Sequence, residues 1–198
     1  MHSIRPTLRT VLLGILIFAT VGCGPNDPGK RPLETTISPV GLRFVRLQDS
    51  LASIQPQGSN LIGMRDTLEH ANGYIWLSRI LDLQDGQIIL DGDFIDDRQA
   101  TQALIDGSQV NRIRIESPSF ETQEGLKVGS TFAELMKAFR DSTLYIDPLP
   151  DYQMLQVQVP NMGMFYLFEE PKLLENGQLE ISPGDLPSDL PIRAIVVM

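Results

Sequence analysis

The sequence has few of the residues on which most reactive sites depend. Its 198 residues include one cysteine and two histidines. A single cysteine excludes an internal disulfide and any metal site built from cysteines alone. Basic residues are outnumbered by acidic ones, 16 to 25, and the net charge of −9 excludes a broad cationic face for nucleic acid. The length fits one domain.

A short targeting segment opens the chain. Two arginines precede an apolar run over residues 11–21, and Gly22 and Cys23 follow it. A charged start, a short apolar run and a small residue before a cleavage point are the features of a secretory signal peptide. The run is shorter than the roughly 20 apolar residues that a membrane-spanning helix needs. Residues 1–22 are therefore predicted to be a signal peptide.

The cysteine lies at the end of this segment, where Thr20-Val21-Gly22-Cys23 resembles the lipobox of bacterial lipoproteins, with Thr in place of the usual Leu. The resemblance implies that Cys23 is alkylated with diacylglycerol, becomes the first residue after cleavage and is then acylated, for example with palmitate. Gly24, where other lipoproteins have Asp, is similar to those sorted to the outer membrane. The alternative is an ordinary signal peptide with an unrelated cysteine, which would leave a free thiol in an oxidising compartment.

The rest of the chain divides into a tether and a body. Residues 23–35 hold the lipidated cysteine and a stretch rich in proline and glycine, which predicts a flexible linker. Residues 36–198 are expected to form a single domain. Because the body is acidic, anionic headgroups would repel it, and the acyl chains must hold it at the membrane. We expect an envelope protein anchored in the outer membrane and facing the periplasm.

Alternation of apolar and polar residues dominates the body. Asp85-Gly86 lies between two apolar runs, which predicts a hairpin. One wet face per strand indicates a mainly antiparallel sheet. The segments expected to form strands are 74–83, 88–90, 110–115, 155–159, 164–168 and 192–197.

Two segments are expected to be helical. Thr131 and Glu134 have the spacing of a capping box, and an apolar stripe continues to residue 140. A weaker helix is expected from Asp97 to Asp106, with Gly107 ending it. The predicted fold class is α+β, a mainly antiparallel sheet of seven or eight strands with two or three short helices in one domain.

An internal repeat is a further hypothesis. Residues 41–54 can be laid against 125–135 if a gap of three residues is allowed, and both blocks place capping residues before an apolar turn. This arrangement indicates two related βαββ-like halves that share a sheet. Chance similarity between two short amphipathic segments explains the same pattern equally well.

The second of these blocks lies in a longer segment with its own resemblance. Residues 117–136, with Thr122, Gly125-Leu126 and Val128-Gly129-Ser130 before a helix, resemble a segment of bacterial envelope lipoproteins of unknown function, among them envelope-stress-regulated lipoproteins of enterobacteria. The segment is also similar to the start of small outer-membrane assembly lipoproteins, whose domains are much shorter. Neither resemblance implies a catalytic residue.

An acidic cluster over residues 91–97 is the most suggestive polar feature of the body. Carboxylates around a glycine can bind Ca²⁺, but the full loop pattern with a distal glutamate is missing. A solvated loop followed by a helix N-cap is the favoured interpretation. His70, the histidine left after cleavage, is interpreted as a surface or capping residue. The weak metal candidates are Asp91, Asp93, Asp96 and Asp97.

No nucleophile elbow and no phosphate-binding glycine loop occurs, so neither a catalytic residue nor a cofactor is predicted. The favoured hypothesis is a non-catalytic binding or scaffolding module, attached to the membrane through Cys23 and bound to a protein partner. One alternative is a carboxylate-based envelope hydrolase that uses residues 91–97. A second is an inhibitor of an envelope hydrolase that uses a protruding loop over residues 182–190.

Overall fold

The protein is mainly β. A computed structural model describes residues 34–71, 74–96, 108–149, 154–170 and 181–198, and strands take up 51% of the interpretable residues against 10% in helices. The expected α+β class is therefore wrong. Within the described ranges, the helical elements are α2 (Phe132–Ala138) and two three-residue 3-10 helices. These are too short to form a helical layer of their own.

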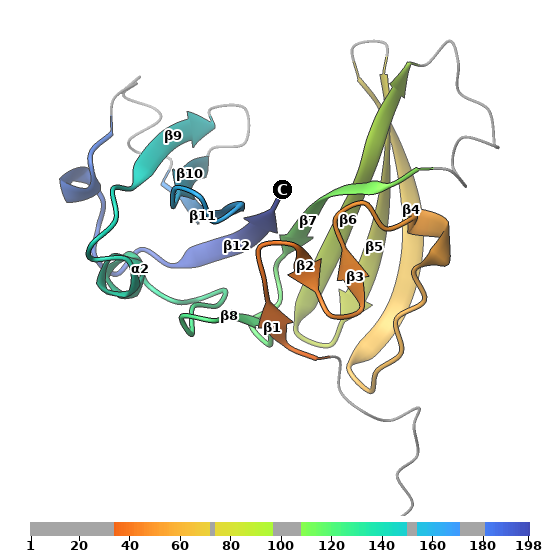
Figure 1. Cartoon of the computed structure of the whole chain (residues 1–198), viewed down its shortest axis with the longest axis horizontal. Helices are drawn as coiled ribbons and strands as arrows, with labels where there is room; N and C mark the ends of the chain where they lie inside the picture. Colours follow the sequence, from red (N-terminus) through yellow and green to blue (C-terminus); the bar gives the residue numbers. More distant parts are fainter. Residues whose placement is uncertain (1–33, 72–73, 97–107, 150–153, 171–180) are drawn as a thin grey trace, which may run out of the picture.

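The fold is built on one eight-stranded antiparallel sheet in the order β4-β5-β6-β7-β12-β11-β10-β9. Strands β4 to β7 form one meander and β9 to β12 form a second, and the two meet between β7 and β12 (Figure 1). The join is short: residues 113–115 of β7 pair with residues 195–197 of β12. The strands are β4 (Leu61–Ala71), β5 (Tyr74–Leu83), β6 (Gly86–Asp96), β7 (Val110–Ile115), β9 (Tyr145–Leu149), β10 (Met154–Gln158), β11 (Met164–Glu169) and β12 (Ile192–Val197).

The hairpin expected at Asp85-Gly86 is confirmed, since it joins β5 to β6. Gly86 is required there because a Cβ would lie 2.7 Å from the backbone oxygen of Glu116. Asp85 accepts hydrogen bonds from the hydroxyls of Ser117, at 2.7 Å, and Ser119. The turn is therefore fixed both by close backbone approach and by the segment that follows β7.

Short elements cover one face of the sheet and close the core. Figure 1 shows β2 (Gly41–Leu42) and β3 (Val45–Arg46) over the first meander and α2 beside the second. A two-stranded parallel pair, β1 (Thr36–Ile37) with β8 (Glu121–Thr122), lies between them. The core contains side chains from both meanders and from this cover, including Leu42, Val45, Leu81, Ile88, Ile113, Leu135, Phe168 and Ile195.

The helix expected to begin at Thr131 is confirmed, with α2 ending two residues before Arg140. Thr131 and Glu134 form the capping box: the Thr131 hydroxyl accepts from the Glu134 amide, and Glu134 accepts from the Thr131 amide at 2.7 Å. Phe132 on the helix packs edge-to-face against Phe168 at 5.6 Å between ring centroids. The second expected helix, over 97–106, lies outside the described residues.

The predicted βαββ halves are wrong, because residues 41–54 hold the short strands β2 and β3 and, in place of an α-helix, a 3-10 helix over Leu51–Ser53. This segment gives its backbone hydrogen bonds to the neighbourhood of β7: the Gln48 amide donates to the Val110 carbonyl at 2.7 Å, and the Leu51 amide donates to the Ser108 carbonyl at 2.9 Å. Pro56 then prevents the helix from continuing. Each half of the sheet is a four-stranded meander, and this is the feature that the two halves have in common.

Candidate functional site

The face of the sheet opposite the core carries a second apolar cluster. Because side chains alternate along a strand, Val196 points away from the core that Ile195 and Val197 enter, and Leu167 does the same between Tyr166 and Phe168. Ala194, Leu167 and Val196 are at least 93% buried, since each has at most 7% of its surface exposed. Leu149, Met154 and Phe165 pack around them.

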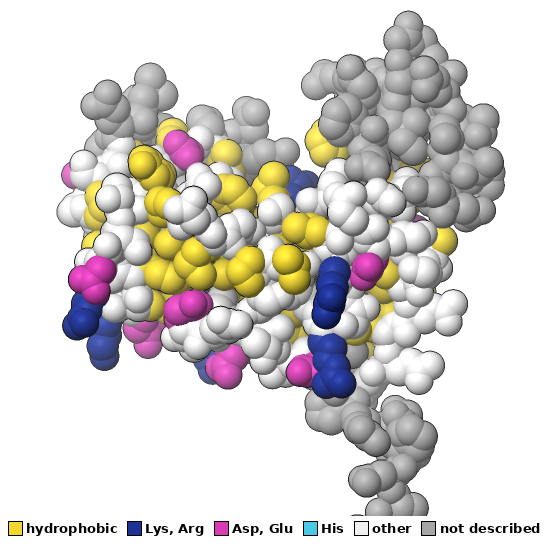
Figure 2. Space-filling model, in the orientation of Figure 1, with side chains coloured by type: hydrophobic (Ala, Val, Ile, Leu, Met, Phe, Trp, Pro, Cys, Tyr) yellow, Lys and Arg dark blue, Asp and Glu magenta, His cyan; other side chains and the backbone are white. Residues whose placement is uncertain are grey.

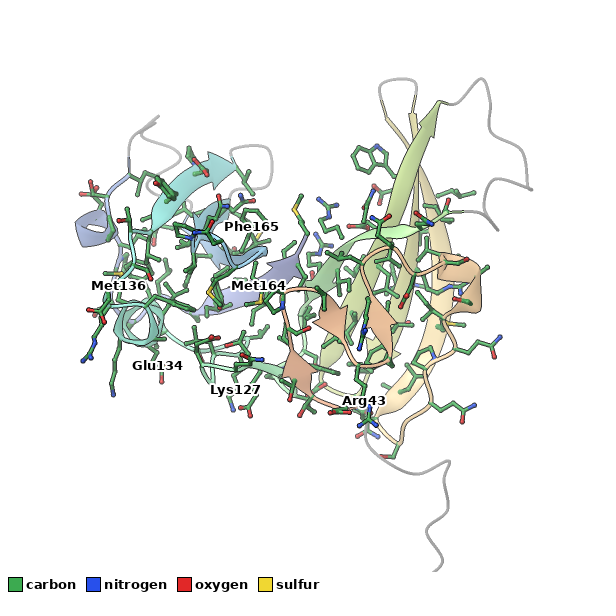
Figure 3. All side chains as sticks on the ribbon, viewed as in Figure 1. Arg43, Lys127, Glu134, Met136, Met164 and Phe165 are labelled. Atoms are coloured by element: carbon green, nitrogen blue, oxygen red, sulfur yellow. The ribbon has the colours of Figure 1, made fainter. Side chains whose placement is uncertain are left out.

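Phe165 lies near the start of β11, close to the junction of the two meanders (Figure 3). In the space-filling view, hydrophobic side chains gather over the half of the molecule that holds β9 to β12, whereas charged side chains lie mainly along its lower edge (Figure 2). In this view, charge therefore borders the hydrophobic side chains mainly along one edge.

Two adjoining hollows open on the sheet next to this cluster. The larger has a volume of about 460 Å³ and the smaller about 110 Å³. Both are lined by Arg114, Met154 and Leu167, so we treat them as one groove and call it the junction groove. Five strands contribute to it: β7, β9, β10, β11 and β12. Its remaining lining residues are Arg112, Glu116, Val128, Gly129, Leu149, Gln156, Glu169, Pro191, Ile192, Arg193, Ala194, Val196 and Met198.

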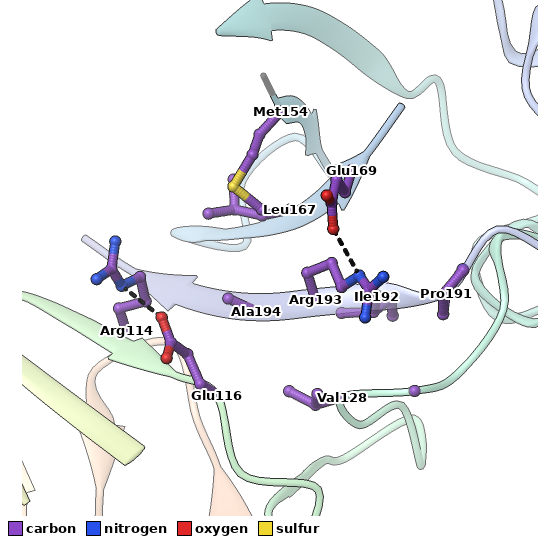
Figure 4. Close-up of a pocket in the computed structure, with 11 residues that line it drawn as sticks. Arg114, Glu116, Val128, Met154, Leu167, Glu169, Pro191, Ile192, Arg193 and Ala194 are labelled. Atoms are coloured by element: carbon purple, nitrogen blue, oxygen red, sulfur yellow. Dashed lines mark ion pairs between the residues drawn. The ribbon is translucent and has the colours of Figure 1, made fainter. Parts of the chain in front are cut away.

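Ion pairs border the junction groove on either side of β12 (Figure 4). Arg114 Nε lies 3.1 Å from Glu116, and Arg193 Nε lies 3.2 Å from Glu169. Each glutamate is directed toward its own arginine and not toward the other glutamate. The two carboxylates therefore do not converge on a common point, as a pair that worked together on one bond would have to do.

Arg114 is the least satisfied polar group of the groove. Its Nε atom is buried and makes no hydrogen bond within the described part of the chain, because the approach to Glu116 has the distance of an ion pair without the geometry of a hydrogen bond. About a third of the side chain, 37%, is exposed. A guanidinium carries five N–H donors, so the exposed part of Arg114 can donate to an acceptor that enters the groove.

Arg112 extends the positive charge along the same strand. Its Nε donates to Asp91 at 2.6 Å, and 40% of its side chain is exposed. Asp91 also accepts from the Ser78 hydroxyl at 2.6 Å and is 7% exposed. Counting Arg193, three arginines lie around this one groove, although the net charge of the chain is −9.

The solvated loop expected at the acidic cluster is wrong, because β6 extends through it to Asp96. The helix whose N-cap was expected there lies outside the described residues. Asp91 is an internal sheet residue held by Arg112 and Ser78 on the two neighbouring strands. The side chains of Asp93 and Asp96, and all of Asp97, lie outside the described residues. In the part that is described, no three metal-binding side chains come together.

His70 was interpreted as a surface or capping residue; it lies within β4, where it pairs with Ile75 of β5, and so it does not cap a helix. Its side chain lies outside the described part. Cys23 and the tether up to residue 33 also lie outside it. Across the ranges that are described, no helix is long and apolar enough to cross a membrane.

The loop over residues 182–190 is attached to α2. The amides of Phe132 and Ala133 donate to the carbonyls of Leu190, at 2.8 Å, and Ser188, at 2.9 Å. Leu190 is buried, as is Leu186. This loop therefore supplies acceptors that the first turn of a helix needs.

The segment that resembles other lipoproteins has a local structural role. Gly125 and Gly129 adopt positive φ angles of 78° and 90°, which favour glycine. The Thr122 amide donates to the Leu126 carbonyl at 2.8 Å, and the Ser130 hydroxyl accepts from the Lys127 amide at 3.2 Å. These contacts build the turns that lead into α2.

Alternation over residues 110–115 predicted that Arg112 and Arg114 lie on the solvent-exposed face of their strand, and the sequence did not predict the junction groove. A signal was present: residues 164–168 and 192–197 are almost continuously apolar, which is typical of strands with two apolar faces. No protein-family model, curated protein or solved structure matches this chain.

Proposed function

We propose that this chain is a lipid-anchored envelope lipoprotein that works as a non-catalytic binding module, and that the junction groove holds a segment of a protein partner. The observation that carries the proposal is the partly exposed Arg114 side chain, whose buried Nε makes no hydrogen bond in the described part of the chain, beside the apolar floor formed by Leu167 and Val196. Convergent polar groups beside apolar lining are characteristic of binding sites.

The lining residues define the chemistry of the partner segment. Arg112 and Arg114 border the smaller hollow with no acidic residue among its lining, so a carboxylate fits there. Met154 and Leu149 offer flexible and branched apolar contacts beside it. The partner segment is therefore expected to present apolar side chains next to an aspartate or glutamate.

A selection from a peptide-display library tests this chemistry directly. The full chain, immobilised in detergent, should enrich peptides that combine apolar residues with an acidic residue. Binding of an enriched peptide should fall at least about tenfold in Arg114→Glu, because a bidentate charge pair is replaced by repulsion.

Arg43→Glu is the matched control, because Arg43 is 77% exposed and lies outside the groove. It should bind the selected peptides as the wild type does. Enrichment of peptides without acidic residues, or equal binding by Arg114→Glu, would contradict the proposed groove chemistry.

The anchor rests on the sequence at Thr20 to Cys23 and has a separate test. Mass spectrometry of the mature N-terminus should find acylated Cys23, and Cys23→Ala should move the protein from the membrane fraction to the soluble fraction. An unmodified cysteine, or a Cys23→Ala protein that stays with the outer membrane, would contradict the anchor and leave the groove test unaffected.

A further inference from the structure

The two edges of the sheet differ in how well they are protected. β9 ends one side and contains Pro148, which has no amide to offer to another strand. β4 ends the other side and runs over Leu61–Ala71 without a proline. Among the residues described, β4 forms a ladder only with β5, so its other edge is open (Figure 1). Open strand edges of this length are templates for further pairing.

The apolar side chains of β4 also lack a cover. Met64 and Leu68 are 46% and 49% exposed, although their direct neighbours on β5, Leu81 and Leu77, are buried in the core. The cover ends at Arg79, which binds Asp66 at 2.7 Å and donates to the Leu51 carbonyl of the 3-10 helix. In the described part of the chain, Met64 and Leu68, on either side of Asp66, therefore have no cover on the core-side face.

We propose that β4 pairs in antiparallel orientation with β4 of a second copy of this chain, with Thr67 on the two-fold axis. In such a pair, opposite residues lie on the same face, and the register is set by the residue at the axis. With Thr67 at the axis, the pairing runs from Gly63 to Ala71 and clears the irregularity between Leu61 and Gly63.

Charge complementarity selects this register. It places Arg65 of each copy opposite Glu69 of the other, and both side chains are exposed in the monomer. Opposite charges and paired threonines are favourable across antiparallel strands. A register centred on Arg65 or on Asp66 would place two identical charges opposite each other at the axis, which is unfavourable.

The same register joins the bare apolar faces. Leu68 of one copy becomes the diagonal neighbour of Leu68 of the other, at a spacing that leucine side chains can bridge. Asp66 lies opposite Leu68 but keeps its bond to Arg79. The junction groove is formed by strands from β7 to β12, at a distance from β4 in the sheet, so the dimer would leave it open.

A charge-swap series on the full chain in detergent tests the pairing. Sedimentation should show a concentration-dependent dimer for the wild type. Arg65→Glu and Glu69→Arg should each raise the dissociation constant at least about tenfold, and the double variant should restore it. Arg65→Glu and the double variant both lose the ion pair with Asp82, so rescue cannot come from that internal contact. A monomeric wild type, or a double variant as weak as the single ones, overturns the proposal.

Cysteine crosslinking in membranes tests the register. Thr67→Cys should form a crosslinked dimer, and so should co-expressed Arg65→Cys and Glu69→Cys, with the wild type as the control for Cys23. Arg65→Cys alone should not crosslink, because its two copies would be roughly 14 Å apart, four residues out of register. Crosslinking of Arg65→Cys with itself, or none at Thr67→Cys, overturns this register.

Discussion

Removing the carboxylate of Asp91 tests the claim that it is a structural residue of the sheet. Asp91→Ala removes two short hydrogen bonds, from Ser78 and from Arg112, at a position that is 7% exposed. Hydrogen bonds to a charged group contribute about 1.5–3 kcal/mol each. Breaking a fully buried ion pair costs about 3–5 kcal/mol, but Arg112 is 40% exposed and regains water when its partner is removed. We therefore expect a loss of about 2–3 kcal/mol.

Urea denaturation should measure this loss, and Tm should fall by roughly 5–10 °C for a domain of this size. Asp141→Ala is the matched control: Asp141 is 88% exposed and paired with an equally exposed arginine, so its removal should change the free energy of unfolding by less than about 0.5 kcal/mol. A change at Asp91 as small as that at Asp141 would refute the structural role.

Calcium distinguishes the structural role from a metal site at the same residue. A ligand at 100 times its dissociation constant stabilises a protein by about 2.7 kcal/mol, which is several degrees in Tm. If Asp91 is occupied by Arg112 and Ser78, millimolar Ca²⁺ should leave the Tm of the wild type unchanged. Stabilisation of the wild type, lost in Asp91→Ala, would instead restore the metal hypothesis.

Three other perturbations have defined outcomes. Thr131→Ala removes the cap of α2 and should lower the free energy of unfolding by about 1 kcal/mol in urea denaturation, whereas Thr131→Ser should change it little. Gly41→Ala should cost about 2 kcal/mol or more in the same assay, because Gly41 has a φ of 126° and a Cβ would lie 2.5 Å from the Val45 carbonyl oxygen. The hydrogen bond from Arg79 lowers the pKa of Asp66 below its ordinary value, so the stability it contributes is present above about pH 4 and is lost as the pH falls through the lowered pKa. The difference in stability between the wild type and Asp66→Asn should therefore shrink on acidification below pH 4, and a difference that grows there would contradict this linkage.

The elements that could be predicted from the sequence are those whose signals are local. The turn at Asp85-Gly86 and the capping box at Thr131 each depend on residues a few positions apart, and both are confirmed. Alternation in the segment 110–115 likewise predicted β7. Hydrogen bonding and side-chain alternation within a short segment are enough to decide these cases.

The elements that were missed depend on distant partners. Acids and glycine are unfavourable in strands, so β6 appeared to end before Asp91. In the fold, Arg112 neutralises that carboxylate and Ser78 donates to it, and a Cβ at Gly92 would lie 2.7 Å from Cδ1 of Leu51, whose side chain would have to move. The segment 41–54 has local features of a helix. It does not form an α-helix, because its backbone amides donate to carbonyls near residue 110. Tertiary contacts outweighed local propensity in both cases.

The junction groove shows why a binding face of this kind has no sequence motif. Two of its arginines come from β7 and the third from β12, its apolar floor comes from β11 and β12, and Met154 comes from β10, so its parts are up to 86 residues apart between Arg112 and Met198. The ladder of three residues between β7 and β12 sets the first group against the others. Because the groove lies on the face opposite the core that both meanders share, substitutions such as Arg114→Glu change the face without removing a core side chain. Binding and folding can therefore be separated experimentally at this junction.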